Sequence, residues 1–197
     1  MTTGINPLVI FFASILTSNM ILSNFLGMCS YISVSGEYKT ASSLGKSVTL
    51  VMVFTTVINY WIYKLVIVPL GLEYLQYVLF IMIIATSVQI IEMAMDRLLP
   101  DLHIKLGIFL PLITVNCAIL GTTLFMVIRE YNFLQSLLFG LGSGLGWWLA
   151  ISALAAIREK MGKAQLPKGL EGPGIAFIIT GIMALAFIGF SGIFTIS

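Results

Sequence analysis

The stretch Gly107-Ile-Phe-Leu-Pro111-Leu-Ile-Thr114-Val-Asn116-Cys117-Ala-Ile-Leu-Gly121 lies within an apolar run long enough to cross a lipid bilayer. Gly107, Pro111 and Gly121 are residues that break or bend helices, and the Thr114 to Cys117 step is polar. Irregular backbone survives at membrane depth only where protein or a cavity surrounds it, because hydrocarbon offers no partner for a freed N–H or C=O. The stretch therefore predicts an interrupted membrane helix that does more than anchor the chain.

The composition places the whole chain in the integral membrane class. Of its 197 residues, 59% are hydrophobic and only 9% are charged, with a mean hydropathy of +1.06. An ordinary globular domain is about 25% charged. The charged residues are clustered, and the apolar intervals between the clusters have roughly the 17–25 residues that a spanning helix needs. The intervals predict spans at 7–35, 47–63, 74–92, 105–128, 133–157 and 173–194.

The positions of the basic residues predict the orientation, because Lys and Arg are retained on the cytoplasmic side. The loops after the first, third and fifth spans hold Lys39, Lys46, Arg97, Lys105, Arg158, Lys160, Lys163 and Lys168. The loops after the second and fourth spans hold only Lys64 and Arg129. We therefore expect both termini outside the cytoplasm. The N-terminus lacks the positive region of a cleavable signal peptide, and no basic patch with interleaved aromatic residues indicates binding to nucleic acid.

The first span contains a counterpart of the opening stretch. Its second half, Ser23-Asn-Phe-Leu-Gly-Met-Cys-Ser-Tyr31, is polar and interrupted by glycine, and Cys29 follows the interruption as Cys117 does in the later stretch. A repeat of three spans inserts its second copy upside down, which gives an inverted-topology pair. We expect an all-α integral membrane fold with six transmembrane helices in a 3+3 inverted-topology repeat, in which helices one and four are interrupted. The chain would form a single transmembrane domain over 1–197, with repeats of about 1–100 and 101–197, and would carry the two cysteines toward one central point.

The two cysteines allow several interpretations. Each could be a small buried hydrophobic residue, as most free cysteines are, or the two could form a disulfide. Metal ligation is the third possibility, because thiolates select iron–sulfur clusters, zinc or copper(I). A cluster typically takes four cysteines, whereas this chain has two, and its only histidine, His103, lies in a loop without the spacing of a zinc site. A cluster would therefore need two more thiolates from a second protein.

The glycine-rich run in the fifth span predicts close helix packing. Gly140 with Gly144, and Gly142 with Gly146, form two overlapping faces of small residues that let helix backbones approach closely. A phosphate-binding loop is excluded, because the run has no Gly-x-Gly-x-x-Gly register and no strand precedes it.

Three polar residues of the second span, Thr55, Thr56 and Asn59, have two interpretations. They could supply oxygen ligands to sodium, since hard cations prefer oxygen. The interpretation we favour is ordinary hydrogen bonding between membrane helices.

Several motifs resemble a known family. The chain is similar over nearly its whole length to the membrane subunits shared by the sodium-translocating NADH:quinone oxidoreductase and the Rnf electron-transport complex. The resemblance rests on the segments 107–118, 24–31 and 158–161. Three further motifs are most similar to the sodium pump, namely Tyr131-Asn-Phe133, Gly142-Ser-Gly144 with Gly146-Trp147, and Phe190-Ser-Gly192. The corresponding Rnf protein usually has Thr where Val115 stands here, and it lacks the tryptophan after the glycine run.

The resemblance implies a specific site and specific partners. It implies that the chain pairs with a homologous membrane protein of the same complex, the D subunit, and that each of the two gives two cysteines to an intramembrane 2Fe-2S cluster. Here these would be Cys29 and Cys117, with Gly27, Thr114 and Asn116 as supporting residues. A single iron held by four thiolates would make the same demand on the chain.

The resemblance also implies a function and a location. NAD, FAD or FMN, and ubiquinone would be bound by other members of a six-subunit translocase in the bacterial inner membrane, with both termini periplasmic. Electrons would pass from NADH toward ubiquinone while Na⁺ leaves the cell, and the chain would not be catalytic alone. The alternatives are an Rnf-type complex and a secondary carrier or channel without a redox centre.

Overall fold

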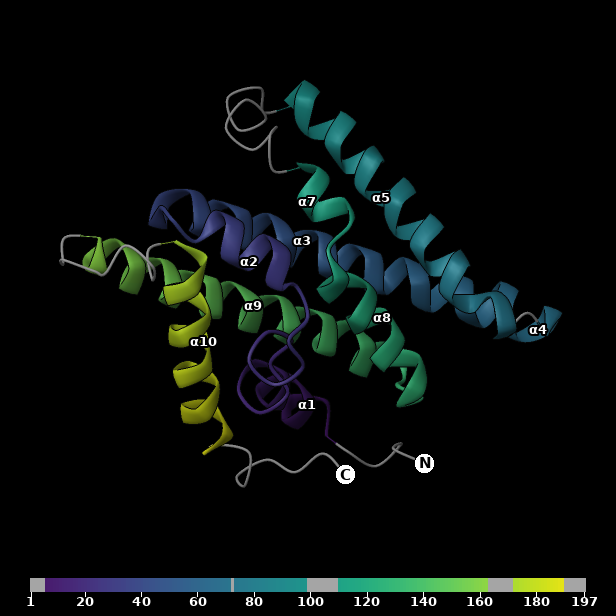
Figure 1. Cartoon of the computed structure of the whole chain (residues 1–197). Coiled ribbons are helices and arrows are strands. Elements are labelled where there is room, and N and C mark those ends of the chain that lie inside the picture. The colour runs from purple at the N-terminus through teal and green to yellow at the C-terminus, as the bar shows by residue number, and fades with distance from the viewer. Residues whose placement is uncertain (1–5, 72, 99–109, 163–171, 190–197) are drawn as a thin grey trace.

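The computed structural model describes residues 6–71, 73–98, 110–162 and 172–189, and every regular element within them is helical (Figure 1). Gly107, which opens the quoted stretch, and His103 lie outside the described residues. The elements are α1 (Pro7–Ile15), α2 (Met28–Val34), α3 (Tyr38–Ile62), η1 (Tyr63–Ile67), α4 (Val68–Leu70), η2 (Glu73–Leu75), α5 (Gln76–Leu98), α7 (Leu110–Thr114), α8 (Cys117–Ile128), α9 (Phe133–Met161) and α10 (Pro173–Ile188).

Two helices extend well beyond their predicted apolar spans. The second span, predicted at 47–63, is part of one continuous helix, Tyr38–Leu70, that contains the π turn η1. This π turn ends two residues before Pro69, whose missing N–H disrupts regular α-helical hydrogen bonding. The third span, predicted at 74–92, continues to Leu98 in α5. The predicted ends are wrong because hydropathy locates the edge of the hydrocarbon, whereas a helix can continue into the polar interface.

The first and fourth spans are both interrupted, as predicted, and the second interruption lies at the polar step before Cys117 rather than at Pro111 or Gly121. In the first span, residues 16–27 separate α1 from α2. In the fourth span the helix ends at Thr114 and begins again at Cys117. Pro111 lies within the first turn of α7, where proline is tolerated. Gly121 lies inside α8, where a Cβ would collide with Leu26, so this glycine makes room for the other interrupted span.

The two long helices, α3 and α9, run antiparallel along each other. A Cβ at Gly144 would lie 2.9 Å from Cα of Thr49, and one at Gly140 would lie 3.1 Å from Oγ1 of Thr56. Residue numbers therefore rise along α9 as they fall along α3. The Gly140/Gly144 face packs against α3, which confirms one of the two predicted glycine faces.

The other glycine face packs against α1. A Cβ at Gly142 would lie 2.7 Å from the carbonyl oxygen of Phe11, and one at Gly146 would lie 3.1 Å from Cα of Ile15. Here the residue numbers rise together, so α1 and α9 run parallel. Both predicted faces are therefore used, each by a different neighbouring helix.

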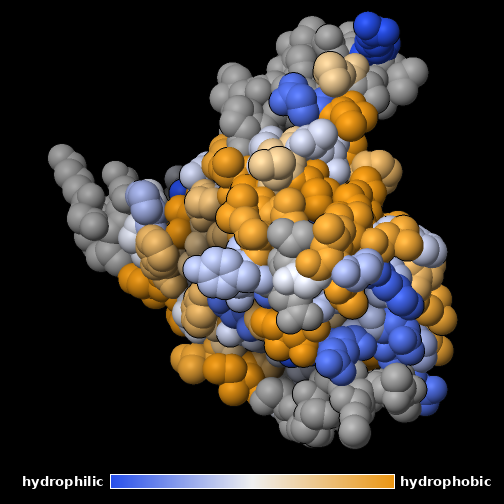
Figure 2. Space-filling view, turned by 90° about the vertical axis from the view of Figure 1, so that its right-hand side faces the viewer, coloured by the Kyte–Doolittle hydropathy of each residue, from blue (hydrophilic) through white to orange (hydrophobic). Residues whose placement is uncertain are grey.

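The distribution of polar and apolar residues is that of a membrane protein. Polar residues such as Asn19, Thr55, Asn59 and Thr122 are fully buried. Large apolar side chains are exposed along α3, α5 and α10, and Figure 2 shows hydrophobic residues over much of the middle of one face. By length and composition Tyr38–Leu70 and Phe133–Met161 can each cross a bilayer, and Gln76–Ile91, Leu112–Ile128 and Pro173–Ile188 are shorter apolar helices.

Candidate functional site

The irregular segment between α1 and α2 is organised by a single buried side chain, Asn19. Its Nδ2 donates to the carbonyl oxygen of Gly146 at 2.9 Å and to that of Ile15 at 3.1 Å. Its Oδ1 accepts from the backbone N–H of Ile21 at 3.0 Å and from that of Leu22 at 3.4 Å. The amide therefore satisfies backbone groups that the end of α1 leaves free and binds the irregular segment to α9.

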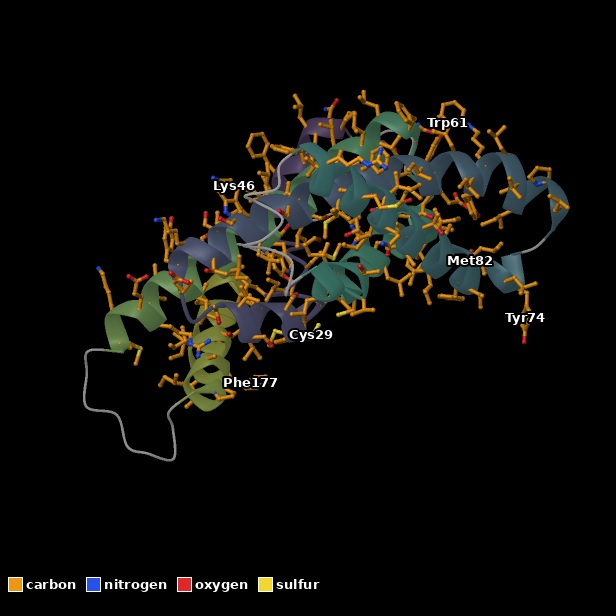
Figure 3. All side chains as sticks on the ribbon, turned by 90° about the horizontal axis from the view of Figure 1, so that it is seen from above. Cys29, Lys46, Trp61, Tyr74, Met82 and Phe177 are labelled. Atoms are coloured by element: carbon orange, nitrogen blue, oxygen red, sulfur yellow. The ribbon has the colours of Figure 1, made fainter. Side chains whose placement is uncertain are left out.

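Both cysteines lie in the first turn of the helix that follows an interruption. Cys29 is the second residue of α2, and Cys117 is the first residue of α8. The thiols are free, and both residues are exposed on the surface of the chain. The buried-residue and disulfide interpretations are therefore wrong, and the two soft donors are accessible to a group or protein outside this chain. Figure 3 shows Cys29 at an edge of the molecule.

The two interrupted spans meet at Gly27. Its backbone N–H donates to Sγ of Cys117 at 2.9 Å. Gly27 has φ of +86°, in the left-handed region that favours glycine. A Cβ at this position would lie 2.5 Å from Nε1 of Trp147 and 3.1 Å from Cβ of Ala118. Gly27 is thus required by both its conformation and its surroundings, and it brings the Cys29 segment against Cys117.

Asn116 forms a second link between the two interruptions. Its Oδ1 caps α8 by accepting from the N–H of Ala118 at 3.0 Å, while its Nδ2 donates to Oγ of Ser30 at 3.2 Å. Ser30 in turn donates to the carbonyl oxygen of Gly27 at 3.2 Å. Thr114 ends α7 directly before the interruption. The structure therefore brings two of the predicted supporting residues, Gly27 and Asn116, to Cys117, and adds Ser30, which the sequence did not single out.

Arg158 joins the carboxyl end of α2 to α9. Its Nη1 donates to the carbonyl oxygen of Ile32 at 3.0 Å and to Oγ of Ser35 at 2.6 Å. A positive charge at the end of a helix also complements the helix dipole. Arg158 therefore fixes the short helix that carries Cys29. The signal available in the sequence was a basic residue in the last turn of a long helix, but its partner could not be identified from that.

Trp147 is fully buried behind Gly27, and its Nε1 has no hydrogen-bond partner among the described residues. The indole ring therefore acts as a wall that fixes the position of the Gly27 segment. In the sequence, Trp147 stands out only as part of a family motif.

The interpretation of Thr55, Thr56 and Asn59 as partners between helices is wrong. The two threonine hydroxyls donate within α3, to the carbonyl oxygens of Val51 at 2.8 Å and of Met52 at 2.6 Å respectively. Neither amide atom of Asn59 has a partner among the described residues. Asn59 lies about one turn after the adjacent Thr55 and Thr56 in α3, and all three side chains are fully buried.

The donor set at the two interruptions fits half of a four-thiolate site. Two accessible thiols lie on segments joined by a backbone N–H to sulfur hydrogen bond. Within the described part of the chain, no group of three or more His, Cys, Asp or Glu side chains could hold a metal ion. A metal centre at these cysteines would therefore take ligands from outside the described residues.

Known proteins resemble the chain over almost its whole length. The model of a family described as Rnf-Nqr subunit, membrane protein, matches residues 8–194. The E subunit of the Na⁺-translocating NADH-quinone reductase of Klebsiella pneumoniae is 50% identical over 190 residues, which cover 93% of this chain and 96% of the relative. The proteins of the same name from Serratia proteamaculans and Yersinia enterocolitica are each 49% identical with the same coverage.

Proposed function

Because the chain belongs to the Rnf-Nqr family of membrane subunits, we propose that it takes the place of the E subunit in a bacterial Na⁺-translocating NADH-quinone reductase. It is a non-catalytic member of that oxidoreductase complex and lies in the inner membrane. The three relatives compared above are all sodium-pump subunits, which favours this complex over an Rnf-type complex.

In this proposal, Cys29 and Cys117 provide half of an intramembrane 2Fe-2S site, and the homologous D subunit provides the other two thiolates. The observation that carries this is the pairing of the two interruptions, in which Gly27 N–H donates to Cys117 Sγ while both thiols stay accessible. Buried cysteines that serve only packing would not be accessible in this way.

When bound, such a cluster accepts and releases one electron at a time. The chain's own residues position the two sulfur atoms. The N–H of Gly27 donates to Sγ of Cys117, which is the first residue of α8. Hydrogen bonds to sulfur raise the reduction potential of iron–sulfur centres. Asn116 and Ser30 hold Gly27 and Cys117 in register.

The proposal includes a 3+3 inverted repeat over about 1–100 and 101–197, as a single six-helix domain with periplasmic termini. The order of the described elements supports it, because each half has two short helices around an interruption, then a long helix, then a further helix. The equivalent long helices α3 and α9 run antiparallel, as an inverted pair must. The equivalent cysteines both follow an interruption.

The decisive experiment is to replace both cysteines in the assembled complex. Cys29→Ser with Cys117→Ser should remove iron and acid-labile sulfide together with the cluster EPR signal, and should stop electron transfer from NADH to quinone. Ser33→Ala is the matched control, because Ser33 is exposed one turn after Cys29 and, among the described residues, its hydroxyl bonds only the Cys29 carbonyl.

Each alternative to this proposal predicts a different outcome of these measurements. Iron without labile sulfide would indicate a single iron held by four thiolates. Ferredoxin:NAD activity in place of NADH:quinone activity would indicate an Rnf-type complex. A wild-type complex without iron, whose electron transfer survives the double replacement, would contradict the redox centre and favour a carrier or channel.

A further inference from the structure

A long groove runs along the outer surface where α3 packs against α9. It is an open groove of about 560 Å³, with Lys46 and Trp148 at one end and Val57 and Leu141 at the other. From Lys46 to Val57 the groove follows α3 for about 16 Å, at the helical rise of about 1.5 Å per residue. The hydrocarbon core of a bilayer is about 30 Å thick. The groove is therefore about as long as the hydrocarbon of one membrane leaflet is thick.

The walls of the groove are apolar. Leu50, Val53 and Phe54 line it from α3, and Leu145 lines it from α9. The hydroxyl of Thr49 also lies in this region, but it donates to the carbonyl oxygen of Gly45 at 2.8 Å. The length of the groove thus offers no free hydrogen-bonding group to a ligand and suits a hydrocarbon chain.

The Lys46 end of the groove is different, because it carries a positive charge. Nζ of Lys46 lies 5.7 Å from the centre of the Trp148 ring, and the indole Nε1 of Trp148 donates to Oγ of Ser42 at 3.3 Å. This ring contact is the only interaction of the Lys46 ammonium with the described residues, so no carboxylate neutralises it there. Tryptophan and lysine are typical of the headgroup region of a membrane.

We propose that this groove binds an anionic phospholipid, with an acyl chain between α3 and α9 and the headgroup phosphate paired with Lys46. Basic pockets between membrane helices bind anionic headgroups in this way. The single charge at one end, and the match to one leaflet, fit a lipid better than a partner helix, which would continue past the bilayer midplane. This site requires only that the chain spans the membrane, and it does not depend on the redox centre.

The groove is also remote from the surface that a partner would cover to complete the cysteine site. Figure 3 shows Lys46 and Cys29 at opposite edges of the molecule. A partner protein docked at the cysteines would therefore leave the groove open to lipid.

The test measures lipid binding to the purified complex in detergent, by native mass spectrometry during titration with phosphatidylglycerol or phosphatidylcholine. We expect the complex to prefer phosphatidylglycerol, and Lys46→Gln to weaken that binding by about fivefold. Leu145→Trp fills the groove and should weaken the binding of both lipids. Lys64→Gln is the matched control, because Lys64 lies on the same continuous helix, 5.8 Å from the Tyr60 ring, outside the groove. It should leave both affinities unchanged.

Two results would overturn the proposal. The first is equal loss of phosphatidylglycerol binding in Lys46→Gln and Lys64→Gln, which would indicate nonspecific attraction to basic side chains. The second is crosslinking of a Leu50→Cys variant to another protein of the complex, which would place a protein in the groove. In lipid-free detergent, the Lys46→Gln, Leu145→Trp and Lys64→Gln complexes should melt at the same temperature as the unmodified complex. This test measures lipid binding and not iron content, so a failure of the lipid proposal can be told apart from a failure of the redox proposal.

Discussion

Gly27 is the residue on which the geometry of the candidate site depends most directly. Its backbone lies between Trp147 and Cys117, and its N–H is the hydrogen-bond donor to the Cys117 sulfur. The positive φ and the lack of space for a Cβ are independent reasons for glycine. A side chain would move the N–H away from the sulfur as well as strain the backbone.

We expect Gly27→Ala to lower the free energy of unfolding by about 2–4 kcal/mol, from the left-handed backbone and overpacking together. Gly36→Ala is the control, because a Cβ at Gly36 would meet no atom within 4 Å. Chemical denaturation of the detergent-solubilised protein measures the difference. The reduction potential of the proposed centre should also fall in Gly27→Ala, since the Cys117 sulfur loses a donor. Equal stability of the two variants would contradict the tight packing described around Gly27.

At the scale of helices, the glycines of α9 hold the bundle together. One face lets α3 approach and the other lets α1 approach, so α9 lies between an antiparallel and a parallel neighbour. Because lipid is as apolar as the side chains, association of membrane helices depends on such close packing rather than on hydrophobic burial.

Gly144→Ala and Gly181→Ala should therefore have opposite effects. A Cβ at Gly144 would lie 2.9 Å from Cα of Thr49, and this backbone atom cannot rotate away. We expect a loss of about 1–3 kcal/mol. A Cβ at Gly181 in α10 would meet nothing within 4 Å, so alanine should gain up to about 1 kcal/mol through helix propensity. Thermal unfolding of the two variants measures both. Destabilisation by Gly181→Ala would indicate a contact of α10 with another protein of the complex.

The glycine faces could be predicted from the sequence, whereas the organisation of the interruptions could not. Spacing of small residues along a helix is local information, and it identified both faces correctly. Asn19 acts through the carbonyl of Gly146, which lies far away in the sequence, so only the packed structure gives it a role.

Which residue ends the second interruption could not be predicted for a similar reason. Pro111 and Gly121 are the stronger helix breakers by residue type, but the capping side chain of Asn116 decides where α8 begins. The exposure of the cysteines also depends on how helices pack. Sequence could name Cys29 and Cys117 as candidates, but it could not show whether the thiols are accessible.

For the molecule as a whole, two side-chain contacts constrain how the chain can be inserted in the membrane. Arg158 near the end of α9 binds Ser35 just after α2, so these two ends lie on the same side. At the other side, the Tyr60 ring near the end of α3 lies 5.6 Å from Phe133 at the start of α9. The packed helices thus fix which turns share a side, while the basic residues decide which side is the cytoplasm.

Reporters of membrane topology can test these two arguments separately. Reporters inserted at Gly36 and Gly162 should both indicate the cytoplasm, and reporters at Gly71 and after Ser197 should both indicate the periplasm. Paired alkaline phosphatase and fluorescent protein fusions measure this, since the first is active outside and the second inside. If Gly36 and Gly162 both lay outside, the charge argument would be wrong and the fold would stand. If they lay on opposite sides, the contact between Arg158 and Ser35 could not exist, and the fold itself would be contradicted.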